Sequence, residues 1–152
     1  MNVELINFDE VFDRAERVVD RTADLRESGP DIDRAFARLE SEQFASEGAS
    51  GRGGRWAPLT RSTEAQKRGR GQILVRTGRL RDSLTRTGHA EHVYRASESE
   101  IELGTSVPYA GRHQRGGKRL PAREVISLTP EQAARLFEPV VRRAREEVGR
   151  LR

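Results

Sequence analysis

The side chains best suited to chemistry are the three histidines, His89, His92 and His113. His89 and His92 are three residues apart, but they fall on a predicted strand edge, and no nearby aspartate or cysteine completes a metal-binding set. We therefore expect no metal site. The chain also contains no cysteine, which excludes disulfides, thiolate metal ligands and cysteine nucleophiles.

Two other patterns that could carry catalysis are incomplete. The glycine-rich run at residues 48–54 lacks the Lys-Ser/Thr ending of a phosphate-binding loop, and no convincing strand precedes it. Ser83 has no evident base partner. The carboxylates are plentiful, but most fall on predicted solvent faces of helices, where they favour solubility. We expect no enzyme activity and no cofactor.

Charge is distributed unevenly along a chain whose formal net charge is +4. Residues 1–30 carry eight acids and four bases, a net −4, whereas residues 48–88 carry ten bases and two acids, a net +8. A basic segment of this kind either contacts nucleic acid or an acidic protein face, or is a solvated arginine-rich loop. The residues singled out as possible DNA or partner contacts are Arg52, Arg55, Arg68, Arg70, Lys118 and Arg119.

The elements that must position these residues follow from apolar spacing. Apolar residues recur every three or four positions over residues 8–27, 31–46 and 130–149, which predicts three helices. Gly29-Pro30 is expected to end the first helix, so that the first two form an antiparallel hairpin or a sharp bend. Residues 47–55 contain four glycines and no apolar residue larger than alanine, which predicts a mobile loop.

The middle of the chain predicts short elements. Alternating residues over 91–97 and 100–105 indicate a β-hairpin, and Val125, Ile126 and Leu128 indicate a third strand. Helical patterns are expected at residues 60–68, 77–84 and 107–116. The lone tryptophan, Trp56, is expected to be a buried packing anchor, although an indole among arginines can also stack on nucleic-acid bases.

Together these elements predict an α+β fold in a single domain over residues 1–152. A small antiparallel sheet of three or four strands is packed by an N-terminal helical pair and a long C-terminal helix. The boundaries are a helical pair at 8–46, a flexible basic loop at 47–55, an α+β core at 56–128 and the C-terminal helix at 129–149. Leu, Ile, Val and Phe number 33 of 152 residues, so we expect a thin core that other subunits help to complete. No apolar run is long enough to cross a bilayer, and no secretory signal is visible.

The order of several local patterns is more specific than any one of them. A glycine-rich loop leads to Trp56-Ala57-Pro58-Leu59, a lysine follows in the next helix, and a Thr-Gly-Arg-Leu-Arg-Asp-Ser run precedes the hairpin. This order resembles the phage virion morphogenesis family, the tail-completion and neck proteins of tailed phages, over about residues 30–148. The residues that carry the resemblance, expected at interfaces or in structural motifs, are Trp56, Pro58, Leu59, Gly78, Leu80, Arg81, Ser83, Tyr109, His113, Gln114, Gly116, Pro121 and Arg123. The chain departs from the pattern at Arg115 and Glu124, where apolar or aromatic residues are common.

The resemblance implies a structural subunit of a ring, usually six-fold, at the head-proximal end of a phage tail. The implied partners are other copies of the chain, the neighbouring tail-tube or terminator and head-closure proteins, and DNA in the channel, with no membrane. The implied location is the tail or neck of the virion, and before assembly the protein is expected in the host cytoplasm. A tail terminator or a head-closure subunit remains an alternative, and a basic nucleic-acid-binding module without sequence preference is an alternative from another class.

Overall fold

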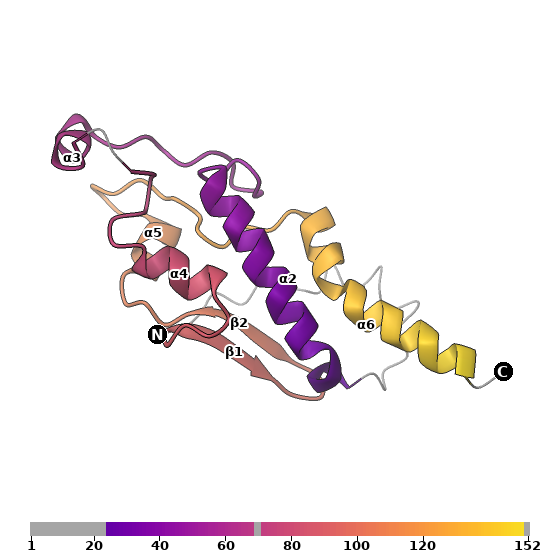
Figure 1. Ribbon diagram of the computed structural model, residues 1–152. Helices are drawn as coiled ribbons and strands as arrows, with labels where there is room; N and C mark the ends of the chain where they lie inside the picture. The colour runs from indigo at the N-terminus through magenta and orange to yellow at the C-terminus, as the bar shows by residue number, and fades with distance from the viewer. Residues whose placement is uncertain (1–23, 69–70, 151–152) are drawn as a thin grey trace.

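The computed structural model describes residues 24–68 and 71–150 of the chain (Figure 1). In this part of the chain the elements follow in the order α2 (Leu25–Ala45), α3 (Arg61–Gln66), α4 (Arg79–Thr85), β1 (His92–Ala96), β2 (Ile101–Thr105), α5 (Ala110–Arg115) and α6 (Pro130–Arg150). The fold is therefore mixed helix and strand, as the sequence predicts, and it ends in the predicted long C-terminal helix.

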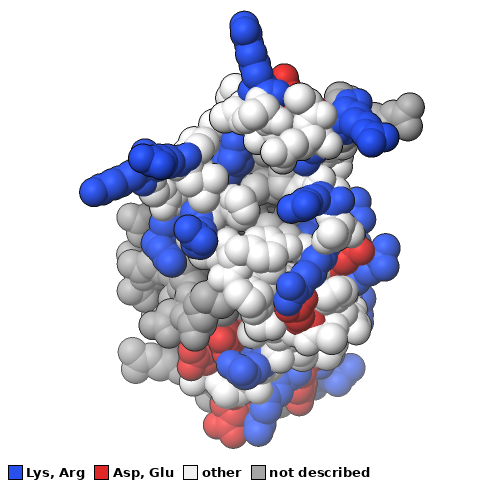
Figure 2. Space-filling model, turned by 90° about the vertical axis from the view of Figure 1, so that its left-hand side faces the viewer, with Lys and Arg blue, Asp and Glu red and all other residues white. Residues whose placement is uncertain are grey.

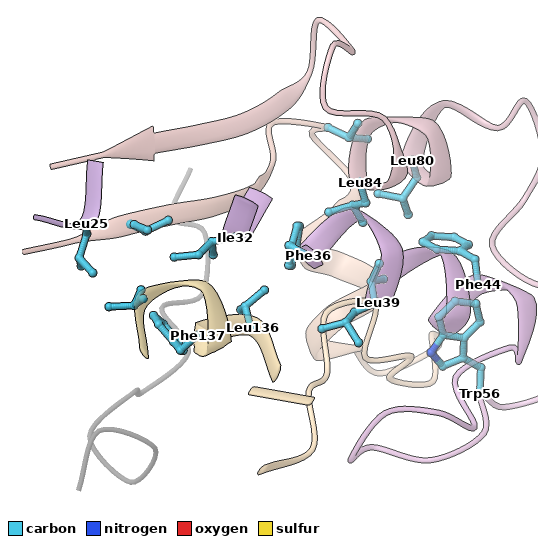
Figure 3. Close-up of a cluster of buried hydrophobic side chains, with 14 of the residues drawn as sticks. Leu25, Ile32, Phe36, Leu39, Phe44, Trp56, Leu80, Leu84, Leu136 and Phe137 are labelled. Atoms are coloured by element: carbon cyan, nitrogen blue, oxygen red, sulfur yellow. The ribbon is translucent and has the colours of Figure 1, made fainter. Parts of the chain in front are cut away.

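The long helix α2 is the centre of the fold. It packs against α6 on one side and against α4 and the β1–β2 hairpin on the other (Figure 1). Each large apolar side chain that is fully buried contributes about 1.5–3 kcal/mol, so these contacts dominate the stability of the subunit. Figure 3 shows the resulting core, with labelled side chains Leu25, Ile32, Phe36, Leu39, Phe44, Trp56, Leu80, Leu84, Leu136 and Phe137.

The prediction that Gly29-Pro30 ends a helix is wrong. Helix α2 begins at Leu25 and continues through both residues. The Asp24 carboxylate caps this earlier start by accepting a hydrogen bond of 2.9 Å from the Arg26 amide. Pro30 lies in the second turn, so the helix forgoes a single backbone hydrogen bond there, and the packing of the remaining turns outweighs that loss.

Gly29 serves packing instead of ending the helix. It is buried, and a Cβ added to it would lie 2.2 Å from the hydroxyl oxygen of Tyr94. The absence of a side chain therefore lets β1 approach the first turns of α2. The other partner of the predicted helical pair, at residues 8–27, lies mostly outside the described residues.

The predicted β-hairpin is present, but the sheet is smaller than expected. Strands β1 and β2 pair antiparallel, with Tyr94 opposite Leu103 and His92 opposite Thr105. Within the described residues the sheet has these two strands, so the third strand expected around residues 125–128 is wrong.

A side chain explains the missing strand. The amides of Val125 and Ile126 donate to the side-chain oxygen of Gln114, so they have no need of a neighbouring strand. The apolar residues that indicated a strand are buried or half-buried all the same, because the segment lies against the core. The third strand is predicted because these residues are apolar, but in the structure they are buried without pairing to another strand.

Two of the remaining helices, α3 and α6, begin at a threonine that caps them. Thr60 caps α3, accepting from the Thr63 amide. At the start of α6, the Thr129 hydroxyl accepts from the Gln132 amide while the Gln132 side chain accepts from the Thr129 amide, which is a reciprocal capping box. None of the helices within residues 24–68 and 71–150 is long and apolar enough to span a membrane.

Candidate functional site

Gln114 of α5 holds the backbone of residues 125–126. Its Oε1 accepts hydrogen bonds from the Val125 amide at 2.8 Å and the Ile126 amide at 3.1 Å, and its Nε2 donates to the Ile126 carbonyl at 2.8 Å. One half-buried primary amide thus satisfies three backbone groups. This fixes residues 125–126 beside α5 without a strand.

Trp56 is an anchor for the same segment. It is 3% exposed, as the sequence predicts, and its ring meets Phe44 edge-on with centroids 5.3 Å apart (Figure 3). Its Nε1 donates to the Glu124 carbonyl at 2.9 Å, and Nε2 of the buried Gln43 donates to the same oxygen at 3.0 Å. The indole therefore works as both a core side chain and a backbone donor.

Arg123 joins this segment to the chain that follows Trp56. Its guanidinium is largely buried and donates from Nε to the Ala57 carbonyl at 2.8 Å and from Nη2 to the Pro58 carbonyl at 3.0 Å. Its amide donates to the His113 carbonyl at 2.7 Å. Burial lowers the pKa of Arg123, yet a guanidinium remains charged at neutral pH, so these are charge-assisted hydrogen bonds.

The glycine-rich loop at residues 47–55 has packing partners that its sequence did not indicate. The Gly53 amide donates to the Ser127 hydroxyl at 2.8 Å, and the Trp56 amide donates to the Glu47 carbonyl at 2.8 Å. Gly51 is buried, and a Cβ there would lie 2.3 Å from the Ser127 carbonyl oxygen. The glycines therefore allow close approach to residues 124–127, and the mobility of the loop stays a prediction.

Residues 57–68, which we call the arm, project from the body of the molecule. None of the residues of α3 is buried, and the helix lies at the end of the molecule farthest from α6 (Figure 1). Two charged side chains fix the return of the chain from the arm. Lys67 donates to the Gln72 carbonyl at 2.7 Å and the Val75 carbonyl at 2.9 Å, and Glu47 accepts from the Ile73 amide at 2.9 Å.

The motif residues of α4 position that helix. Gly78 precedes it with a φ of +82°, a conformation that favours glycine. Leu80 is buried, and the Ser83 hydroxyl donates to the Leu80 carbonyl at 2.8 Å and lies 2.7 Å from the Thr105 hydroxyl. Arg81 forms an ion pair with its neighbour Asp82. The contact between the Ser83 and Thr105 hydroxyls ties α4 to β2.

The Asp33–His92 pair was missed by sequence reasoning. The His92 Nε2 lies 2.7 Å from an Asp33 carboxylate oxygen, and its Nδ1 lies 2.8 Å from the Ser83 carbonyl. The two side chains are 1% and 9% exposed, so the pair is a buried link between α2, β1 and α4. The one feature of the sequence that could have indicated this pair is the position of Asp33, a charged residue that directly follows Ile32 on the apolar side of the predicted helix.

Tyr109 and His113 lie together at the surface beside α4. Tyr109 is 36% exposed, its ring meets His113 edge-on at 6.0 Å, and the Arg79 guanidinium lies 6.0 Å from its centroid. The Nδ1 of His113 is buried with no hydrogen-bond partner within the described residues. Burial, together with the charges of Arg123 and Arg112, lowers the pKa of His113, so the ring is neutral at neutral pH.

The exposed cations gather at the end of the molecule that carries the arm. Figure 2 shows lysine and arginine side chains over the upper part of this face, and acidic side chains mixed with basic ones toward its lower end. Arg52, Arg55, Arg68, Lys118 and Arg119 are all exposed, whereas Arg70 lies outside the described residues. Pro58 and Pro121 are exposed, and Leu59 is half-buried against the core. We call the basic end the exposed residues Arg52, Arg55, Arg61, Arg68, Arg76, Arg112, Arg115, Lys118 and Arg119.

The motif residues thus form one connected support. Gln114 and Trp56 hold backbone groups of residues 124–126, whereas Arg123 and Lys67 fix the two ends of the arm. Gly116, with a φ of +69°, allows the turn that brings residues 121–123 back to α5, since a Cβ there would lie 2.6 Å from the Ala122 nitrogen. This arrangement is suited to positioning a contact surface.

Comparisons with known proteins agree with this reading. The model of the phage virion morphogenesis family matches residues 6–144, which includes every motif residue described above. No curated protein and no solved structure matches the chain. Because the match spans most of its length, the chain belongs to the phage virion morphogenesis family and has a structural role in building phage particles.

Proposed function

We propose that this protein is a tail-completion or neck subunit, which forms a ring at the head-proximal end of a phage tail and helps to join the tail to the head. The observation that supports this most is the use of the family's motif residues. Trp56 and Gln114 hold backbone groups of residues 124–126, and the adjacent Arg123 holds the Ala57 and Pro58 carbonyls at the base of an exposed, basic arm. Residues used in this way build a contact surface.

The proposal assigns no catalysis to the chain. The Ser83 hydroxyl is 2.7 Å from the Thr105 hydroxyl, and the imidazole of His92 faces the Ser83 carbonyl and the Asp33 carboxylate. The serine hydroxyl and the histidine therefore do not form a nucleophile–base pair. Both side chains connect elements of the core.

The partners that we propose are further copies of the chain in a ring, six-fold by analogy with the family, and the neighbouring tail and head-closure proteins. A ring leaves a channel for DNA, so residues of the basic end that line the channel would meet phosphates. The proposed location is the tail or neck of the virion.

Deletion of the gene from the phage or prophage that encodes it tests this function. We expect full heads and tails of normal length that do not join, and we expect purified protein to restore joining in the extract. Tails of irregular length would indicate a tail terminator instead, and heads that lose their DNA would indicate a head-closure subunit. Normal infectious particles without the protein would contradict all three roles.

The basic end favours one candidate from another class, a nucleic-acid-binding module without sequence preference. Long arginine side chains on loops are poorly placed to read base edges, so any binding would depend on phosphate charge. With about six phosphates neutralised, raising salt from about 50 to about 200 mM would weaken binding about a thousand-fold. Replacing Arg52, Arg55, Arg68 and Arg70 by serine would flatten that dependence. Tight binding to one sequence that resists salt would place this candidate first.

A further inference from the structure

The arm and the turn of the β-hairpin lie far apart on the molecule. In Figure 1 α3 is at the upper left, and the turn between β1 and β2 is at the bottom, beside the start of α2. These two regions also differ in charge. Among the described residues, Arg55 is the one member of the basic end that forms an ion pair, with Glu47 at 4.0 Å.

The hairpin end carries an excess of carboxylates, which we call the acidic tip: Asp24, Glu98, Glu100 and Glu102. Two arginines lie among them. Arg26 pairs with Asp24 and Glu98, and Arg95 pairs with Glu102 at 2.7 Å. Four carboxylates and two guanidiniums leave a net −2, and Glu100 is exposed with no ion pair among the described residues.

We propose that the arm of one subunit docks on the acidic tip of the next copy in the ring. The inference rests on the ring function proposed above and adds the two surfaces that meet. A contact between two different surfaces of identical chains is heterologous, and it closes a ring when its rotation closes. Opposite charges on two separate surfaces of one molecule suit this contact, whereas two basic ends or two acidic tips would repel each other.

The structure of the arm also fits a docking element. Helix α3 has the sequence Arg-Ser-Thr-Glu-Ala-Gln, has no buried residue and adds nothing to the core of its own subunit. Its two ends are nevertheless fixed, by Arg123 at Ala57 and Pro58, and by Lys67 at Gln72 and Val75. An exposed polar helix held at both ends is pre-organised, which lowers the entropy cost of binding.

Reciprocal charge reversal tests the contact. The arm variant carries Arg61→Glu and Arg68→Glu, and the tip variant carries Glu98→Lys and Glu100→Lys. Each variant alone places like charges at every arm–tip contact, so we expect its ring assembly to weaken about tenfold or more. Mixed in equal amounts, they can alternate around a ring with opposite charges at every contact, so we expect assembly to return.

The measurement is the mass of the assembled species at low and high salt, both free and on purified tails that lack the protein. A matched control, Arg135→Glu with Arg145→Glu on exposed positions of α6, changes the net charge equally and should assemble as the wild type does. Circular dichroism checks that each variant is folded. As an independent measurement, Ala65→Cys and Ser99→Cys in one chain should crosslink neighbouring copies into a ladder, since the chain has no other cysteine.

The outcomes separate this inference from the proposed function. Rings that form normally with the arm variant, and copies that do not crosslink between residues 65 and 99, would overturn the arm–tip contact and leave the ring function standing. Loss of DNA binding in an arm variant that still assembles would assign the basic end to DNA and overturn the contact. A wild-type chain that never assembles, free or on tails, would overturn both.

Discussion

The side-chain amide of Gln114 and the peptide group of Ile126 exchange two hydrogen bonds, one from the Ile126 amide to Oε1 at 3.1 Å and one from Nε2 to the Ile126 carbonyl at 2.8 Å. This is the pairing that a residue of an adjacent antiparallel strand would supply. The Gln114 side chain therefore takes the place of a strand, and it connects α5 to the segment before α6.

Replacing Gln114 by leucine should destabilise the subunit strongly. The change leaves the Val125 amide and both Ile126 backbone groups without partners, at about 1–3 kcal/mol for each group that stays buried. We therefore expect a loss of about 3 kcal/mol or more in the free energy of unfolding, measured by urea denaturation. The control Gln66→Leu, at an exposed position of α3, should change stability by less than about 0.5 kcal/mol. Equal effects of the two changes would contradict the role of Gln114.

Replacing Trp56 by alanine should cost about 3–5 kcal/mol, because it removes a large core side chain and leaves a cavity beside Phe44. Replacing it by phenylalanine keeps an aromatic ring but removes the hydrogen bond to the Glu124 carbonyl, which still accepts from Gln43. We expect that second change to cost less, with about 1 kcal/mol for the lost bond. A loss below about 1 kcal/mol for the alanine variant would show that the indole does not support the isolated subunit.

Gly116 and Gly117 form a matched pair of neighbouring sites. Gly116→Ala places a Cβ 2.6 Å from the Ala122 nitrogen at a φ of +69°, so we expect a loss of about 2 kcal/mol or more. Gly117→Ala meets nothing within 4 Å and should be nearly neutral. Thermal unfolding of both variants measures the difference. If the two variants unfold at the same temperature, the tight turn at Gly116 is not required.

Glu40 of α2 should make stability depend on pH. Its side chain is buried, its Oε2 has no hydrogen-bond partner within the described residues, and burial raises its pKa well above the usual glutamate range. The folded state therefore holds a proton that the unfolded state releases. The contribution of Glu40 to the free energy of unfolding consequently falls as pH rises above the usual glutamate pKa. The fall is at most about 1.4 kcal/mol per pH unit and stops above the raised pKa.

The matched variant for this effect is Glu40→Gln, which has nearly the same shape and no titrating proton. Denaturation of both proteins from about pH 5 to about pH 9 should show the wild type losing stability relative to the variant as pH rises. A difference that stays constant over this range would mean that Glu40 is not held protonated in the folded subunit.

Hydrogen exchange should divide the loop at residues 47–55 into protected and unprotected amides. Gly53 and Trp56 donate hydrogen bonds, and we expect both amides to be protected in the folded subunit. The amides of Arg52 and Arg55 have no acceptor among the described residues and should exchange fast. Ser127→Ala removes the acceptor of Gly53 and should speed its exchange alone. Uniformly fast exchange across the loop would restore the mobile loop that the sequence predicts.

The sequence alone determined the features that depend on neighbouring residues. The helical patterns at residues 60–68, 77–84 and 130–149 predicted α3, α4 and α6, and alternation predicted the β1–β2 hairpin. These signals act within a few residues, so they can be read without the tertiary structure. The ordered motifs likewise identified the family, whose match extends over residues 6–144.

The tertiary structure decided what distant residues do to one another. Gly29 predicts a helix end by itself, but Tyr94, 65 positions later in the sequence, packs over it inside a continuous helix. The Asp33–His92 bond joins residues 59 positions apart.

The predicted third strand shows the same limit. Strand propensity records only that Val125, Ile126 and Leu128 are apolar, whereas the Gln114 side chain is the hydrogen-bond partner of the Val125 and Ile126 backbone groups. Propensity is a small local preference, and burial together with hydrogen-bond satisfaction, settled only when distant segments meet, outweighs it.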